Sequence, residues 1–123
     1  MQVLSVAVGG ALGAVSRYFL GNFISRIIGS ALPYGTFVIN IVGCFFMGLI
    51  MTMIIERGML SVAWRLFLCV GFLGGFTTFS SFGYETLVLL QEERFASAML
   101  YVGGSVFCGL AAATVGVTLA RLL

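Results

Sequence analysis

The sequence predicts an all-α integral membrane protein that crosses the bilayer four times. Apolar residues make up 61% of the 123-residue chain and charged residues only 8%, whereas a soluble domain has about 25% charged residues. The ranges 27–55, 66–84 and 95–120 contain no charge at all, and each reaches the roughly 18–20 residues that cross a bilayer core. Lipid must therefore cover most of the surface.

The kinds of charged residue exclude several functions. All six basic residues are Arg, all four acidic residues are Glu, and His, Lys and Asp are absent. The chain therefore has no paired acid and base and no usual set of metal-binding side chains, so we do not expect an enzyme. A net charge of +2 without a basic run gives no surface for nucleic acid. The three cysteines lie in apolar stretches without CxxC spacing and are expected to be small buried residues.

The first two helices have recognisable boundaries. The first is expected over 3–28, with Arg17 inside it. A cleaved signal peptide is the alternative there, because small residues are dense, but no basic residue precedes the apolar stretch, as signal peptides require. The second helix, 34–55, follows Pro33, whose missing N–H costs nothing at a helix start. Gly58 is a suitable C-terminal cap for it.

The third helix is expected over 61–90 and to be broken near its midpoint. Its segment 71–83 has three glycines within five positions, which should interrupt a helix. Non-helical backbone survives at membrane depth only where protein buries it or where it lines a cavity or an ion site. The short polar hairpin 91–94 leads to the fourth helix, 96–120.

The arginine distribution favours two insertion orientations. Three arginines lie on one side of the membrane and two on the other, with a third leaning toward it: Arg57, Arg65 and Arg121 against Arg26, Arg94 and Arg17. So small a bias does not select one orientation, and we expect dual topology with an antiparallel homodimer, unless other signals select one orientation. In such a dimer the midplane break would meet its own copy, and its freed carbonyls would suit a cation such as Na⁺. A plain glycine kink is the alternative.

Three pairs of small residues are spaced four positions apart: Gly9 and Gly13, Gly71 and Gly75, and Ser105 and Gly109. Such pairs let membrane helices approach closely. They suit packing within one subunit, and the same spacing also suits packing between subunits.

Polar side chains within the spans favour an anion as the transported species. Most are neutral hydrogen-bond donors, and no carboxylate lies in the middle of the first, second or fourth helix, where a cation or proton path would need one. The groups are Arg17; Thr36 and Asn40; Thr77, Thr78, Ser80, Ser81 and Glu85; and Tyr101 and Ser105. Phe79 and Phe82 share a helix face, and their ring edges suit weak anion contacts, although lipid or core packing is the ordinary role of such residues.

Three ordered motifs carry a family resemblance. They are Gly9-Gly10-xx-Gly13-xxx-Arg17-Tyr18, Gly35-Thr36-xxx-Asn40-xx-Gly43 and Gly71-Phe72-x-Gly74-Gly75-x-Thr77-Thr78-Phe79-Ser80-Ser81-Phe82. With them the chain resembles the Fluc (CrcB-type) family of fluoride channels over essentially its whole length. The resemblance implies a single transmembrane channel domain, 1–123, that pairs as an antiparallel homodimer with two pores. It also implies passive export of cytoplasmic fluoride across the cell inner (plasma) membrane.

The resemblance further implies roles for particular residues. The fluoride pore is expected to be lined by Asn40, Thr78, Phe79, Ser80, Phe82, Tyr101 and Ser105. The vestibule or pore mouth is expected to contain Arg17, Thr36 and Glu85. The backbone carbonyls of Gly74 and Thr77 are expected to bind a structural Na⁺ at the dimer centre. The next turn of the fourth-helix polar track needs a hydroxyl but falls on Gly109, which leaves Cys108, Thr114 or water for that role.

Two other functions fit a four-helix protein of this length. A small multidrug-type antiporter is also a dual-topology dimer. Such antiporters look as if they need a carboxylate in the first helix, whereas this chain has Arg17 there. A non-transporting scaffold subunit matches the bulk composition, and it predicts no ion flux and tolerance of Asn40→Ala. The expected partners are a second copy of the chain, fluoride and the lipid bilayer, without nucleic acid.

Overall fold

The computed structural model describes all residues, 1–123, and contains helices only. The elements are α1 (Gln2–Ile28), α2 (Tyr34–Ile55), α3 (Val62–Arg65), the π-helix η1 (Leu66–Leu73), α4 (Gly74–Phe76), α5 (Phe79–Gln91) and α6 (Phe95–Leu122). The segments from α3 to α5 form one membrane-length unit, so four helical units are long and apolar enough to span a bilayer. The four expected helices are thus confirmed, with ends within two residues of the predicted ones.

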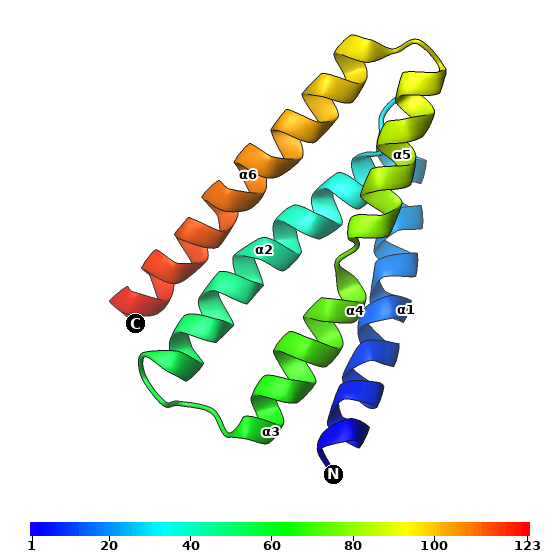
Figure 1. Ribbon diagram of the computed structural model, residues 1–123. Helices are drawn as coiled ribbons and strands as arrows, with labels where there is room; N and C mark the ends of the chain where they lie inside the picture. The colour runs from blue at the N-terminus through cyan, green and yellow to red at the C-terminus, as the bar shows by residue number, and fades with distance from the viewer.

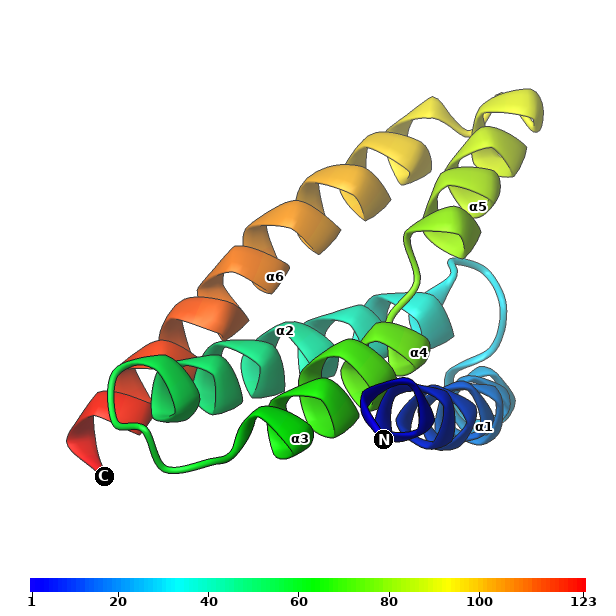
Figure 2. The same ribbon diagram turned by 60° about the horizontal axis from the view of Figure 1, so that its bottom comes forward.

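The helices form two closely packed pairs. In Figures 1 and 2, α6 runs along α2, and α1 runs along the first half of the third span, formed by α3, η1 and α4. Beyond the break, α5 turns away from the direction of α4 and joins α6 at the hairpin. A small core of Leu89, Ala98 and Tyr101 lies between α5 and α6. The break therefore lies where the two pairs of helices meet.

Glycines allow the backbones within each pair to touch. A Cβ at Gly9 would collide with the Phe67 carbonyl oxygen, and one at Gly75 would lie 2.5 Å from the Gly10 carbonyl oxygen. The same close approach joins α6 to α2, where Gly116 faces the Phe45 carbonyl. These contacts confirm the packing of the small-residue pairs at Gly9 and Gly71 within one subunit.

The third span is broken, but the predicted cause of the break is wrong. Gly71 lies in the π-helix and Gly74 and Gly75 lie in α4, and the bare backbones of Gly71 and Gly75 pack against α1. The chain leaves the helix at Thr77 and Thr78, whose ψ angles are 161° and 122°. The break thus falls on two threonines that follow Phe76, one residue beyond the glycines, still near the middle of the span.

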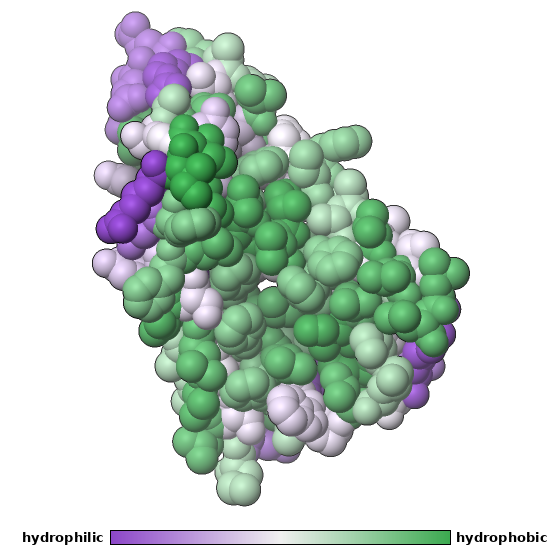
Figure 3. Space-filling view, turned by 180° about the vertical axis from the view of Figure 1, so that it is seen from behind, coloured by the Kyte–Doolittle hydropathy of each residue, from purple (hydrophilic) through white to green (hydrophobic).

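The surface and the ends agree with a membrane location. Figure 3 shows hydrophobic residues over most of one face, with hydrophilic residues toward its ends and edges.

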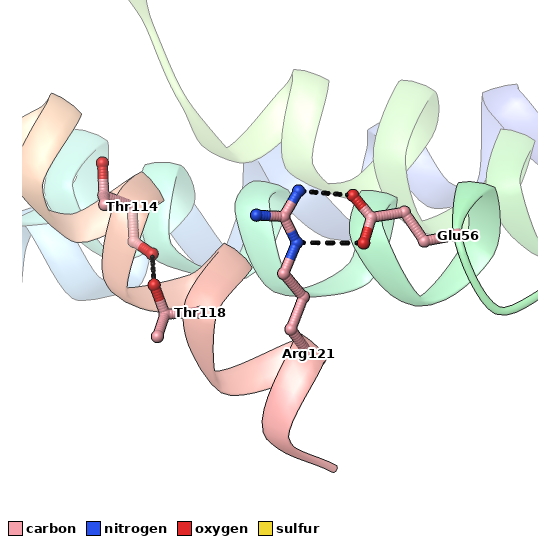
Figure 4. A network of polar contacts seen from close by, with 4 residues as sticks. All are labelled: Glu56, Thr114, Thr118 and Arg121. Carbon is pink, nitrogen blue, oxygen red and sulfur yellow. Dashed lines mark hydrogen bonds and ion pairs between the residues drawn. The ribbon is translucent and has the colours of Figure 1, made fainter.

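The C-terminal end of α2 is capped as predicted. Gly58 has a positive φ of 61° and its N–H donates to the Ile54 carbonyl. At the same end, Glu56 accepts two hydrogen bonds from Arg121 of α6, at 2.6 and 3.0 Å (Figure 4).

Candidate ion path at the helix break

The side chain of Asn40 holds the break in its extended conformation. Asn40 lies on α2, opposite the break, and its Nδ2 donates to the Thr78 carbonyl at 3.0 Å. Its Oδ1 accepts from the Thr78 N–H at 2.9 Å. The amide thus satisfies both backbone groups of one residue that no longer has helical partners, which is what the membrane interior requires of non-helical backbone.

The break changes the partners of two carbonyl groups expected to bind Na⁺. In a continuous helix the Thr78 N–H would donate to the Gly74 carbonyl, but here it donates to Asn40. The Gly74 carbonyl therefore lacks that donor and fits a cation. The Thr77 carbonyl accepts from Arg17 Nη1 at 3.2 Å, so it fits Na⁺ only if the guanidinium turns away.

Hydroxyl groups gather at the start of α5. Thr78 Oγ1 caps this helix by accepting from the Ser81 N–H at 3.2 Å, and it donates to Ser81 Oγ at 3.1 Å. Ser80 Oγ lies 3.4 Å from the same Thr78 oxygen. Because the N-terminal end of a helix carries partial positive charge, this cluster offers donors in a field that favours an anion.

A groove of about 330 Å³ runs beside the break. It is lined by Asn40, Gly43, Cys44, Met47, Thr77, Thr78, Phe79, Phe82, Ser105 and Val106. The rings of Phe79 and Phe82 are 5.7 Å apart, so they share one wall. Ser105 Oγ is buried and has no hydrogen-bond partner, which leaves its proton available inside the groove. Five of the seven predicted pore residues therefore line one groove, whereas Ser80 and Tyr101 do not line it.

A second hollow, of about 270 Å³, lies on the other side of Thr78 and is mostly polar. We call it the vestibule; its lining is Arg17, Tyr18, Gly21, Asn22, Ser25, Pro33, Gly35, Thr36, Ile39, Thr78, Ser81 and Glu85. The three residues expected at a vestibule or pore mouth are all present. Thr78 lines both hollows, so the groove and the vestibule are neighbours at the break.

Two predicted polar residues, Thr36 of the vestibule and Tyr101 of the pore, both donate to Glu85. Thr36 Oγ1 donates to Glu85 Oε1 and the Tyr101 hydroxyl donates to Glu85 Oε2, each at 2.7 Å. The Tyr101 ring packs against Phe82 with centroids 5.2 Å apart. Tyr101 therefore supports the groove wall with its ring, while its proton is held by a carboxylate.

Sequence reasoning missed polar residues on α1 and the thiol of α2. Asn22 and Ser25 line the vestibule, and their signal was spacing: Asn22 is one turn after Tyr18, and Ser25 is two turns after Arg17. Near Gly109, where a hydroxyl was expected, Cys44 Sγ lies 3.4 Å from the position a Cβ would take.

The two residues suggested for the place of Gly109 lie elsewhere. Thr114 donates to the Leu110 carbonyl of its own helix on the exposed side, and Cys108 does not line the groove. Cys44 is the polarisable group that the structure brings beside Gly109, on the groove wall.

Fold and site together define a small helical membrane protein with a donor-lined groove at a broken span. The chain belongs to the CrcB family, since the family model described as "CrcB-like protein, Camphor Resistance (CrcB)" matches residues 4–117. With its four apolar helices, this membership makes the chain a multi-pass protein of the cell inner membrane.

Close relatives extend over nearly the whole chain. A protein of Chloroflexus aurantiacus is 48% identical over 120 residues, which are 98% of this chain and 95% of the relative. One of Acidobacterium capsulatum is 47% identical over 94% of this chain and 93% of its own length. One of Rhizobium etli is 42% identical over 100% and 98%. Each is named "Fluoride-specific ion channel FluC", which is the name of a channel and not of an enzyme.

Proposed function

We propose that this chain is the subunit of a fluoride-selective channel that lets fluoride leave the cytoplasm passively. The observation that carries the proposal is the groove beside the break, which neutral donors and two phenylalanines line without any carboxylate or cation. The names of its relatives support fluoride as the anion. The groove and the vestibule together would form the path.

The donor set suits a small and strongly hydrated anion. Fluoride must exchange its water for close hydrogen-bond donors, and Ser105 and the remaining N–H of Asn40 can supply them in the groove. The ring edges of Phe79 and Phe82, which carry partial positive charge, narrow the same passage. Neutral donors replace water without the deep electrostatic trap of a row of cations, so the ion can also leave. A larger anion such as chloride would fit less well.

The proposed working unit is an antiparallel homodimer with two such paths. The groove is open along the subunit, and Phe79, on its wall, is 83% exposed. A second copy laid over this face would close the groove. The nearly even arginine distribution supports insertion in both orientations, and a two-fold axis in the membrane plane would place both breaks at the dimer centre.

Sodium at that centre is part of the proposal. The freed Gly74 carbonyl of each subunit would hold it, joined by Thr77 where Arg17 leaves that carbonyl. The ion would supply positive charge that ties the two breaks together. Replacing Na⁺ by N-methylglucamine should lower the dimer fraction measured by single-molecule photobleaching. An unchanged dimer fraction would remove Na⁺ from the proposal.

Fluoride efflux from proteoliposomes tests the function. With purified protein, a fluoride electrode should record rapid efflux down the gradient that needs no proton gradient, with chloride efflux far slower. Proton-driven uptake of a lipophilic cation would instead establish the small multidrug-type antiporter. Absence of any ion flux from correctly folded protein would favour the scaffold subunit.

A further inference from the structure

Glu85 joins three spans without an oppositely charged partner. The carboxylate belongs to α5 and accepts one hydroxyl from α2, Thr36, and one from α6, Tyr101, each at 2.7 Å. Both ion pairs of the structure use other carboxylates, Glu56 and Glu92. A charge inside a membrane span is costly and is usually functional. A carboxylate that has only two neutral hydrogen-bond partners there is therefore unusual.

The hydrogen bonds decide what the two hydroxyls can offer an anion. A hydroxyl has a single proton to donate, and Thr36 and Tyr101 both donate theirs to Glu85. Only oxygen lone pairs remain, and these repel anions. Glu85 lines the vestibule and also a neighbouring hollow of about 320 Å³ that reaches the loop at Pro33 and the hairpin at Arg94. An anion moving between these hollows therefore passes a fixed negative charge.

The same vestibule contains a positive charge that attracts anions. Arg17 lines it together with Glu85, and its guanidinium forms no ion pair in the structure. A site with Arg17 and several free hydroxyl donors would bind a small anion strongly. Conduction requires binding that is strong enough for entry and weak enough for release, so something must limit this attraction.

We propose that Glu85 limits the strength of anion binding in the vestibule, so that the permeating anion is not retained there. It acts through its own charge and by holding the protons of Thr36 and Tyr101 away from the path. This inference rests on the proposed function, because it concerns the anion that the channel conducts. It assigns the carboxylate a role opposite to that of a binding group: its removal should strengthen anion binding.

The test compares Glu85→Gln with Glu93→Gln in the full-length reconstituted protein. The second variant removes the same charge from the exposed hairpin. Fluoride flux is measured against fluoride concentration, and fluoride binding to the detergent-purified protein is measured by calorimetry. For Glu85→Gln we expect the half-saturating concentration and the Kd to fall about tenfold and the maximal flux to fall as well. Both constants should stay at the wild-type value in Glu93→Gln.

The direction of the change separates this role from a structural one. Loss of packing alone would lower the maximal flux while leaving the half-saturating concentration unchanged or higher, and that result would overturn the proposal. If Glu85→Gln does not fold, Tyr101→Phe decides, since it keeps the ring against Phe82 and removes a proton that the anion does not use. Its half-saturating concentration should stay within about twofold of the wild type, and a large rise would overturn the proposal.

The proposed function and this inference can fail separately. If the wild-type protein gives no fluoride flux, the channel proposal fails, while the calorimetric comparison still decides whether Glu85 weakens anion binding. If flux is normal and Glu85→Gln binds fluoride no more tightly than the wild type, only the inference fails.

Discussion

Glu56 and Glu85 both join helices that are far apart in the sequence, but they do so in different surroundings. Glu56 at the end of α2 forms a bidentate ion pair with Arg121, and both side chains are substantially exposed (Figure 4). Glu85 lies part-buried among hydroxyls of two other spans. An exposed ion pair contributes little to stability, whereas a charge without a counter-ion in a span is expensive.

The same contrast holds for the regions around the two carboxylates. Around Glu56, α2 and α6 are continuous and pack through glycines such as Gly48 and Gly116. Around Glu85 the span is broken, and side chains such as Asn40 replace the lost helical hydrogen bonds. We call the ends of α2 and α6 at Glu56 and Arg121, together with the loop that follows α2, the closed end. We call the segment around Thr77 and Thr78, with Asn40 and Glu85, the break region. Function should therefore respond strongly to changes in the break region and weakly to changes at the closed end.

Asn40→Ala should have the largest effect. The variant leaves the Thr78 N–H and carbonyl without partners inside the membrane, at a cost of about 1–3 kcal/mol each. We expect fluoride flux to fall by about 100-fold, which corresponds to roughly 3 kcal/mol, together with a lower Tm in detergent. Asn22→Ala, which removes an amide from the vestibule without touching the break, should keep the wild-type Tm. Wild-type flux in Asn40→Ala would contradict the pore assignment and favour the scaffold function.

Phe79→Ile and Phe82→Ile come next. Isoleucine keeps the apolar bulk but lacks the positive ring edge, so we expect flux to fall by roughly tenfold, or about 1.4 kcal/mol, with the fold intact. Phe107→Ile on α6 is the matched control, because Phe107 is 75% exposed and does not line the groove. Electrode-measured efflux should separate the two positions from the control; equal flux in all three variants would remove the phenylalanines from the path.

Much of the fold was predictable because membranes impose simple rules. Charge-free stretches of sufficient length indicated three of the four helices, the first being interrupted by Arg17, and Pro33 and Gly58 marked the ends of α2. The place of the break was not predictable from glycine content, since Gly71, Gly74 and Gly75 all lie in helical segments. Asn40 decides the place, through a contact between residues 38 positions apart, and no local pattern reports such a contact.

The site was predictable as a set of residues but not as a network. Asn40, Phe79 and Ser105 do meet in one groove, as the polar pattern and the family motifs indicated. The direction of each proton was beyond the sequence, because a hydroxyl donates to whichever acceptor the packing brings near. That is why Tyr101, expected to serve the ion, is found donating to Glu85, and why Arg17 is found on the Thr77 carbonyl.

At the closed end, added charge should change orientation without changing the path. Met59→Lys with Ser61→Lys places two positive charges in the loop between α2 and α3, which should retain that loop in the cytoplasm. Cysteine-labelling topology assays should show one orientation, and flux should fall several-fold because antiparallel partners become scarce. Met59→Gln with Ser61→Gln is the control.

A rescue experiment tests the antiparallel pairing directly. Coexpression with a variant carrying two lysines in the hairpin 91–94 should restore flux. Fixed topology with full flux would contradict the antiparallel dimer.

Glu56→Gln should have the smallest effect. Hydrogen bonding to Arg121 lowers the pKa of the Glu56 carboxyl below its usual range, so the pair stabilises the folded state while Glu56 is ionised in both folded and unfolded chains. This contribution is lost as the pH falls through the depressed pKa of the folded state. The variant should therefore melt slightly below the wild type at neutral pH, and the gap should close at acidic pH and at high salt. Glu93→Gln should show no such gap. Flux at neutral pH should remain close to the wild type, because the ion pair lies far from the break. A Glu56→Gln channel that fails to conduct would contradict the distinction between the closed end and the break region.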